Sequence, residues 1–220
     1  MRTRALLCAA ALAAGAVSGM AQNVYSLNVV GYVNKSFSAN NYVLAGNPLN
    51  GTNNNLSTII PNPPNQTQIN RWNSAAQDLD PVTPTFFTAT GKWNSDPVLN
   101  PGEGFFVIAG ADFTNTFVGN VPQGSLTNPV PILGSGNYVA VAPNVPLGGG
   151  ITNVLAGYVP SNQDQINTWN VGTQDLDPSS PTYFTATSKW NADVNLAVGD
   201  GFFLIRAGAA TTWVQNFTVQ

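Results

Sequence analysis

The stretch that decides the fold is present twice: residues 68–94 read QINRWNSAAQDLDPVTPTFFTATGKWN, and residues 165–191 read QINTWNVGTQDLDPSSPTYFTATSKWN. The second stretch begins 97 positions after the first, and 19 of the 27 aligned residues are identical. Similarity at this level indicates that one structural unit occurs twice. We call the residues before position 125 the first copy and those from 125 onward the second copy.

The alternation of residue types at the start of this stretch predicts a strand. From Gln68 to Trp72 the two amides and the indole fall on one face, and Ile69 falls on the other. We expect a loop carrying Asp-Leu-Asp-Pro next, followed by a second strand over residues 85–93, which is rich in threonine and aromatic residues. The second copy predicts the same elements at 165–169 and 182–190.

The segments around the repeat also have strand and turn patterns. An opening strand is expected over 26–37, either continuous or bent at Gly31, and short apolar strands at 42–45 and 138–142. Residues 99–104 (LNPGEG) predict a tight turn into 105–108 (FFVI), a strand buried on both faces, which recurs at 202–205. The closing strand at 117–121 resembles the opening one, so it could also open the second copy. At most one or two helical turns, capped by Asn or Thr, fit at 54–60 and 152–156.

Composition favours β-structure. Charged residues are only 8% of the chain, whereas there are 21 glycines and 16 prolines. Such a composition suits strands and turns better than surface helices. We therefore expect an all-β protein of two tandem repeats, each a β-sandwich or Greek-key barrel-like unit with at most one short helix, spanning residues 22–124 and 125–220.

The N-terminus resembles a secretory signal peptide. Arg2 and Arg4 precede an apolar run from Ala5 to Val17, and small residues follow up to Ala21. This run is shorter than the roughly 20 residues that a membrane-spanning helix needs, so cleavage after residue 21 is favoured over a retained anchor. We expect a secreted protein in the periplasm, on the cell surface or outside the cell, with no membrane span in the mature chain.

Charge and residue types exclude several classes of function. Without the signal peptide, five basic residues face ten acidic ones, which gives no electrostatic basis for binding nucleic acid. There is no histidine, and the one cysteine, Cys8, lies in the signal peptide. The chain without the signal peptide therefore lacks the His and Cys residues that nucleophilic triads and nitrogen or thiolate metal sites require. We expect no cofactor, no metal, no catalytic residue and no enzyme activity.

The acidic residues remain as candidates for oxygen chemistry. Glu103 and its equivalent Asp200 lie in Gly-x-Gly turns, where a carboxylate most often accepts hydrogen bonds from local backbone N–H groups. The second set forms two Asp-x-Asp loops, which could bind Ca²⁺ or form Asx-turns; they contain Asp78 and Asp80, and Asp175 and Asp177. We favour the turns in both cases.

Four tryptophans recur at equivalent positions beside Asn and Lys: Trp72, Trp93, Trp169 and Trp190. Exposed indoles beside amides and carboxylates are typical of sugar-binding surfaces, because a flat ring stacks on the face of a pyranose. Large aromatic residues also fill the cores of proteins that have no disulfides. Core positions are favoured, but these four residues, with the four aspartates above, form the candidate ligand-binding set.

Three motifs carry a resemblance to known sequences: 28–34 (NVVGYVN), 42–49 (YVLAGNPL) and 99–106 (LNPGEGFF). They resemble a loose group of uncharacterised secreted bacterial proteins found in Verrucomicrobia and related lineages. The resemblance implies a secreted protein and brings no activity, cofactor or catalytic residue. The second copy departs from the last motif at 197–200 (AVGD), which has no proline.

The sequence therefore predicts a non-catalytic binding or structural protein of the cell envelope or extracellular matrix, with a polysaccharide or an envelope component as partner. A carbohydrate-binding module that uses the Trp, Asp and Asn residues is the alternative. An enzyme acting on glycosides would have to work with Asp and Glu alone.

Overall fold

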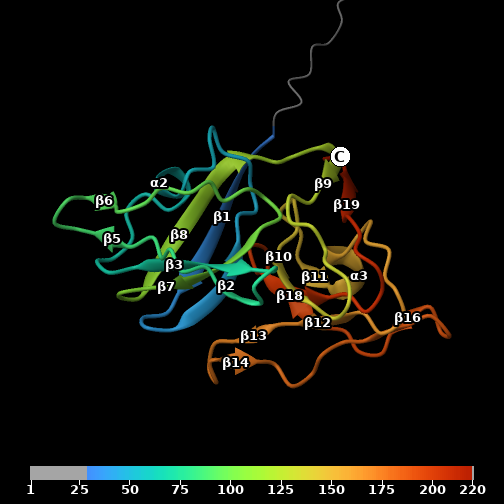
Figure 1. The fold of residues 1–220 in the computed structure, drawn as a ribbon. Helices are drawn as coiled ribbons and strands as arrows, with labels where there is room; N and C mark the ends of the chain where they lie inside the picture. Colours follow the sequence, from blue (N-terminus) through green and yellow to red (C-terminus); the bar gives the residue numbers. More distant parts are fainter. Residues whose placement is uncertain (1–28, 220) are drawn as a thin grey trace, which may run out of the picture.

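The computed structural model describes residues 29–219, and these residues form an all-β protein with two short helices, as the sequence predicts. The expected signal peptide, residues 1–21, and the first residues of the expected opening strand lie outside the described part. In Figure 1 the first copy, blue to green, and the second copy, yellow to red, lie side by side.

Each copy contains a central antiparallel sheet. In the first copy the strand order is β2 (Tyr42–Gly46), β7 (Gly104–Ile108), β3 (Gln68–Asn73) and β4 (Asp78–Leu79). In the second copy it is β10 (Tyr138–Val141), β18 (Phe202–Ile205) and β12 (Gln165–Asn167), while β13 (Trp169–Asn170) pairs with β14 (Asp175–Leu176). The registers agree, because Tyr42 lies opposite Ile108 and the equivalent Tyr138 opposite Ile205.

A two-stranded ribbon accompanies each sheet. β1 (Val30–Phe37) pairs along its whole length with β8 (Phe113–Asn120), and β9 (Gly124–Thr127) pairs with β19 (Val214–Phe217). Figure 1 shows the first ribbon on the left and the second near the C-terminus. The second copy thus has its own opening strand, β9, and the prediction that β8 also opens the second copy is wrong. Gly31 lies inside a continuous β1, so of the two alternatives the continuous strand is confirmed and the bend is not present.

The predicted strand over residues 85–93 is also wrong. These residues form a hairpin of two-residue strands, β5 (Phe86–Phe87) and β6 (Lys92–Trp93), and the second copy repeats it as β15 (Tyr183–Phe184) and β16 (Lys189–Trp190). The turn needs a left-handed residue, which is Gly91 in the first copy (φ 63°) and Ser188 in the second (φ 54°). One more pair, β11 (Gly149–Gly150) with β17 (Asn195–Leu196), completes the strands.

Two single-turn helices occupy the predicted places, α2 (Leu56–Ile59) and α3 (Ile151–Val154). Neither is capped by the side chain of its N-cap residue, so the predicted Asn or Thr caps are wrong. A distant aspartate caps each helix instead: Asp96 accepts a hydrogen bond from the N–H of Ser57 at 2.8 Å, and the equivalent Asp193 accepts one from the N–H of Ile151 at 2.7 Å.

The buried residues form three clusters. Two of them lie within a copy, and fully buried Phe105 and Phe202 belong to these. The third lies between the copies and consists of Leu44, Phe106, Ala140 and Phe203. Strands β7 and β18 therefore contribute to a core on each face, which explains their uninterrupted apolar sequences and confirms the prediction that they are buried on both faces.

Backbone contacts also join the two sheets. Ala45 of β2 bridges to Asp200, and Glu103 bridges to Val141 of β10. Ala45 of the first copy corresponds to Val141 of the second, and Glu103 corresponds to Asp200. Each pair is therefore the other with the two copies exchanged, as a two-fold relation between the copies produces. The division of the chain into two separate tandem sandwich or barrel units remains a prediction. We call the region between the two copies the junction, and it is the best-defined feature that both copies help to form.

Candidate functional site

The junction is held by reciprocal hydrogen bonds from the repeated stretch. Trp72 Nε1 donates to the main-chain oxygen of Tyr138 at 2.8 Å, and Trp169 Nε1 donates to that of Tyr42 at 2.7 Å. Strand alternation explains this placement, because Ile69 on the opposite face of β3 is fully buried in the core of the first copy. The two tryptophans therefore lie where the sheets of the copies meet.

A glutamine of each copy completes this arrangement. Gln77 Oε1 accepts a hydrogen bond from the N–H of Tyr138 at 2.8 Å, and Gln174 Oε1 accepts one from the N–H of Tyr42 at 2.7 Å. Both glutamines have a left-handed backbone, with φ of 55° and 56°. A conformation that costs free energy recurs at equivalent positions, so it is part of the junction's construction.

A groove of about 920 Å³ opens at the junction. Its lining is almost entirely made of equivalent pairs from the two copies: Tyr42 and Tyr138, Trp72 and Trp169, Gln77 and Gln174, Asp78 and Asp175, Leu79 and Leu176, and Phe106 and Phe203, with Asn40 in addition. The groove thus combines six aromatic rings with two carboxylates, and its volume is within the range of small-molecule sites.

The rings of the groove contact one another across the junction. Trp72 packs edge-on against Phe203, with centroids 5.1 Å apart, and Trp169 packs in the same way against Phe106 at 4.9 Å. Phe106 and Phe203 themselves lie 6.1 Å apart. Edge-to-face pairs of this kind stabilise the arrangement beyond simple burial.

The other two predicted tryptophans lie elsewhere. Trp93 is buried in the core of the first copy and donates from Nε1 to the main-chain oxygen of Ile60 at 3.0 Å. Trp190 is half-buried, packs against the core of the second copy and lies against the Tyr183 ring. Of the four tryptophans, the structure brings only Trp72 and Trp169 to the groove.

The two Asp-x-Asp loops are divided in the same way. Exposed Asp78 and Asp175 line the groove, and each carboxylate accepts a bond from the next backbone N–H at 2.7 Å. Asp80 and Asp177 do not line it, and Asp177 instead accepts bonds from Thr168 Oγ1 at 2.6 Å and Asn170 Nδ2 at 3.1 Å. Within residues 29–219 no group of three acidic, His or Cys side chains could hold a metal ion.

The turn of the first loop is built by Asn73, one of the amides that follow the tryptophans in the sequence. Asn73 Oδ1 accepts hydrogen bonds from the N–H groups of Ala75 and Ala76, and equivalent Asn170 does the same. The Asx-turn therefore precedes the aspartates. It returns the chain so that β4 pairs with β3, with Asp78 opposite Asn73.

The carboxylates of Glu103 and Asp200 stabilise turns, as predicted. Glu103 accepts a bond from the N–H of Asn100 and Asp200 accepts one from that of Ala197, both at 2.7 Å. Each also has a cation nearby, Arg71 at 3.3 Å from Glu103 and Lys35 at 2.5 Å from Asp200. Burial raises the pKa of Glu103, although the Asn100 bond and Arg71 act in the opposite direction.

Comparisons with protein-family models, curated proteins and solved structures found no match. The site must therefore be interpreted from its own geometry. Among the described residues, no helix is both long and apolar enough to cross a membrane.

Two buried amides on the same face as the groove were not singled out in the sequence analysis. The Oδ1 atoms of Asn70 and Asn167 are buried and have no hydrogen-bond partner among the described residues. Asn70 lies opposite Phe106 and Asn167 opposite Phe203, so their side chains share a sheet face with the groove rings. Unpaired buried polar atoms are rare and costly, and this pair occurs at equivalent positions.

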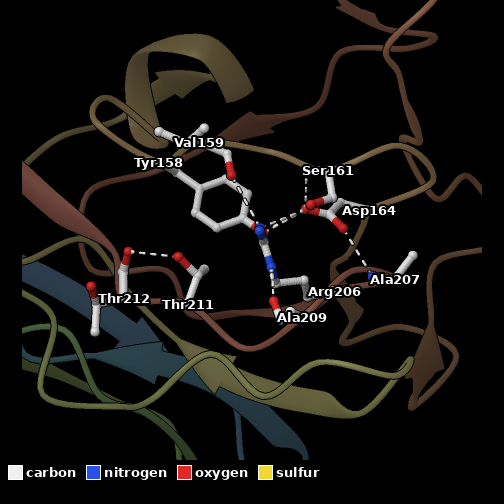
Figure 2. A network of polar contacts seen from close by, with 9 residues as sticks. All are labelled: Tyr158, Val159, Ser161, Asp164, Arg206, Ala207, Ala209, Thr211 and Thr212. Carbon is white, nitrogen blue, oxygen red and sulfur yellow. Dashed lines mark hydrogen bonds and ion pairs between the residues drawn. The ribbon is translucent and has the colours of Figure 1, made fainter.

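A second polar cluster occurs only in the second copy. Asp164 is fully buried, and its carboxylate accepts bonds from Tyr158 Oη at 2.6 Å, Arg206 at 3.2 Å and the N–H of Ala207 at 2.9 Å (Figure 2). The first copy has Thr67 at the equivalent position, and its hydroxyl accepts a bond from the N–H of Gly110. The Asp164 carboxylate thus makes the same backbone contact as the Thr67 hydroxyl and adds the bonds to Tyr158 and Arg206. Because both copies make the backbone contact, we interpret the cluster as structural.

Proposed function

We propose that this chain is a secreted, non-catalytic carbohydrate-binding protein of the cell envelope or extracellular matrix, and that the junction groove is its binding site. One observation carries the proposal: a groove of about 920 Å³ lined by six aromatic residues and two exposed aspartates. Membership of the group of secreted bacterial proteins is part of this proposal, because it rests on the sequence motifs.

The lining suits a sugar better than a purely apolar ligand. Aromatic rings complement the C–H faces of a pyranose, and the carboxylates of Asp78 and Asp175 are acceptors for its hydroxyl groups. Each of these carboxylates uses one oxygen for the next backbone N–H, so the other oxygen can accept a bond from a ligand.

The structure also supports a binding role over catalysis. A glycosidase needs one carboxyl group that acts as an acid and a second that acts as base or nucleophile, about 5–10 Å away. The described carboxyl group whose pKa burial raises, Glu103, accepts a turn hydrogen bond and pairs with Arg71, and it does not line the groove. Glu103 therefore does not supply an acid to the groove.

Tryptophan fluorescence of the purified protein tests the proposal, because two of the five tryptophans line the groove. Titration with a panel of neutral and acidic oligosaccharides should shift the emission and protect it from an aqueous quencher. Asp78→Asn should weaken binding, whereas Asp96→Asn, a matched exposed aspartate that caps α2, should leave it unchanged. Emission that responds to no sugar would contradict the proposal.

A structural or adhesive subunit is the second candidate. It is favoured by an exposed cross-strand patch on the first ribbon, where Tyr32 is 72% exposed and lies opposite Val118, 50% exposed. The occupant of such a patch would be a second copy of this chain. Sedimentation at increasing concentration, with and without Ca²⁺, tests this candidate, and a protein that remains monomeric throughout would exclude it.

A further inference from the structure

We infer that the junction groove binds one uncharged, linear polysaccharide segment that lies across both copies, and that it does not bind two separate sugars. The inference rests on the proposed function and adds the class of ligand and the number of molecules bound. It follows from the order of the aromatic rings, the pairing of the lining residues and the charge of the groove.

The aromatic rings of the two copies are interleaved. In one series of ring contacts, Trp169 of the second copy is followed by Phe106 of the first, then by Phe203 of the second and Trp72 of the first. The neighbours in this path are 4.9, 6.1 and 5.1 Å apart. Phe106 and Phe203 are only 4% exposed and belong to the core between the copies, so the accessible rings of this path are the half-buried Trp72 and Trp169 at its two ends. These two tryptophans come from different copies, so a ligand that rests on both contacts both copies.

The tyrosines flank this path, and Tyr42 lies 5.7 Å from Phe106. Tyr42 lies 6.4 Å from Trp169, and Tyr138 lies 5.8 Å from Phe203. Hydrogen bonds from the glutamines and tryptophans hold the backbone of both tyrosines, so the rings are positioned before a ligand arrives. A preorganised surface loses less conformational entropy on binding.

Equivalent residues recur along the groove, and this repetition matches a ligand with repeating units. Asp78 and Asp175 occupy equivalent places, as do Leu79 and Leu176. Successive units of a polysaccharide present hydroxyls and C–H faces of the same kind, so each end of one segment can meet an aspartate, a leucine and aromatic rings. A monosaccharide can contact only part of this surface.

The charge of the groove selects against acidic polysaccharides. Neither lysine nor arginine lines it, whereas exposed Asp78 and Asp175 do. The chain without its signal peptide also has twice as many acidic as basic residues. A uronic acid or sulfated chain would therefore be repelled, and an uncharged chain would not.

Isothermal titration calorimetry on the purified protein tests this inference. The probes are the hexasaccharides of cellulose, chitin and mannan as uncharged chains, a galacturonate hexasaccharide as the acidic chain, and glucose and mannose as single units. At least one uncharged hexasaccharide should bind at one molecule per protein chain. The acidic hexasaccharide and the single sugars should bind at least tenfold more weakly.

Variants of the two halves provide the second part of the test. Asp78→Asn and Asp175→Asn should each weaken binding of that hexasaccharide by a similar factor, about fivefold for one charge-assisted hydrogen bond replaced by a neutral one. Asp96→Asn should leave the affinity unchanged. An effect of only one of the two groove variants would overturn the inference, because it would place the ligand on one half.

The remaining outcomes separate the inference from the proposed function. Two hexasaccharide molecules per chain, or an acidic hexasaccharide that binds as tightly as an uncharged one, would overturn the inference while sugar binding stands. Failure of every sugar, neutral and acidic, to bind would overturn the proposed function and the inference together.

Discussion

The indole of Trp72 donates a hydrogen bond of 2.8 Å to the main-chain oxygen of Tyr138, which belongs to the other copy of the repeat. Trp169 makes the reciprocal bond to Tyr42 at 2.7 Å. The most similar stretch of the two copies is thus used to join them, and this junction is also where the groove lies. The residues that join the copies therefore also line the groove that we propose as the binding site.

The reciprocity of these bonds predicts equal effects of equivalent substitutions. Trp72→Phe and Trp169→Phe each remove one junction hydrogen bond and should lower the free energy of unfolding by about 1–2 kcal/mol. Tyr32→Phe, a change in a largely exposed aromatic residue, should have no measurable effect. Urea denaturation followed by circular dichroism measures all three, and a large effect of only one tryptophan would contradict the reciprocity.

Gly46 faces its own equivalent in the other copy. A Cβ added at Gly46 would lie 2.1 Å from the Cβ of Ala142, so only one of the two positions can carry a methyl group. Gly46→Ala should destabilise the protein by about 1–3 kcal/mol, the usual cost of overpacking.

The exchanged pair supplies the control for this prediction. The double variant Gly46→Ala/Ala142→Gly moves the methyl group to the other copy and should recover most of the lost stability. Thermal and urea unfolding of the single and double variants measure the coupling. No recovery in the double variant would show that the two positions do not face each other.

The buried ion pair of the second copy should be costly to break. Arg206→Leu leaves the fully buried Asp164 carboxylate without its cation, which should lower the free energy of unfolding by about 3–5 kcal/mol. Arg71→Leu is the matched control, because the Arg71 side chain is 39% exposed and its pair with Glu103 should contribute about 1 kcal/mol or less. Equal effects of the two substitutions would refute this ranking.

Glu103 should make stability depend on pH. Burial raises its pKa above the ordinary 4.5, so the folded state favours the protonated form. The contribution of protonated Glu103 to the free energy of unfolding is fully present below pH 4.5, and it is lost as the pH rises through the pKa of Glu103 in the folded state.

Glu103→Gln removes this titration while keeping an acceptor for the N–H of Asn100. The variant should therefore gain stability relative to the parent between pH 4 and pH 7, as measured by urea unfolding at both pH values. A difference that is constant, or that changes in the other direction, would show that ionisation of Glu103 does not oppose folding.

The unpaired amides of Asn70 and Asn167 should reduce stability. Asn70→Leu and Asn167→Leu replace a buried, unsatisfied oxygen with an apolar group of similar shape, so each should raise the free energy of unfolding by about 1 kcal/mol. Asn115→Leu is the control, since Asn115 Nδ2 donates to the main-chain oxygen of Ile59 and its loss should destabilise. A loss of stability in the Asn70 and Asn167 variants would indicate that these amides are paired in solution.

Local sequence patterns predicted much of the fold. The alternation in Gln68 to Trp72 separated Ile69 from the face that carries the indole, and uninterrupted apolar residues indicated the doubly buried strand around Phe106. The hairpin at 85–93 was missed although Gly91 favours its left-handed turn, because the threonine and aromatic residues on both sides of the turn favour one continuous strand. The helix caps were missed because Asp96 and Asp193 are about 40 residues away from the helices that they cap.

By itself the sequence determined the all-β class, the repeated stretch, the faces of its strands and the chemistries that a chain without histidine cannot perform. Only the tertiary structure decided which tryptophans and aspartates come together. Alternation fixes the face on which a side chain lies, but it says nothing about what packs against that face. Here the opposing surface is the other copy, some 60 to 130 residues away along the chain, so the groove exists only when both copies fold together.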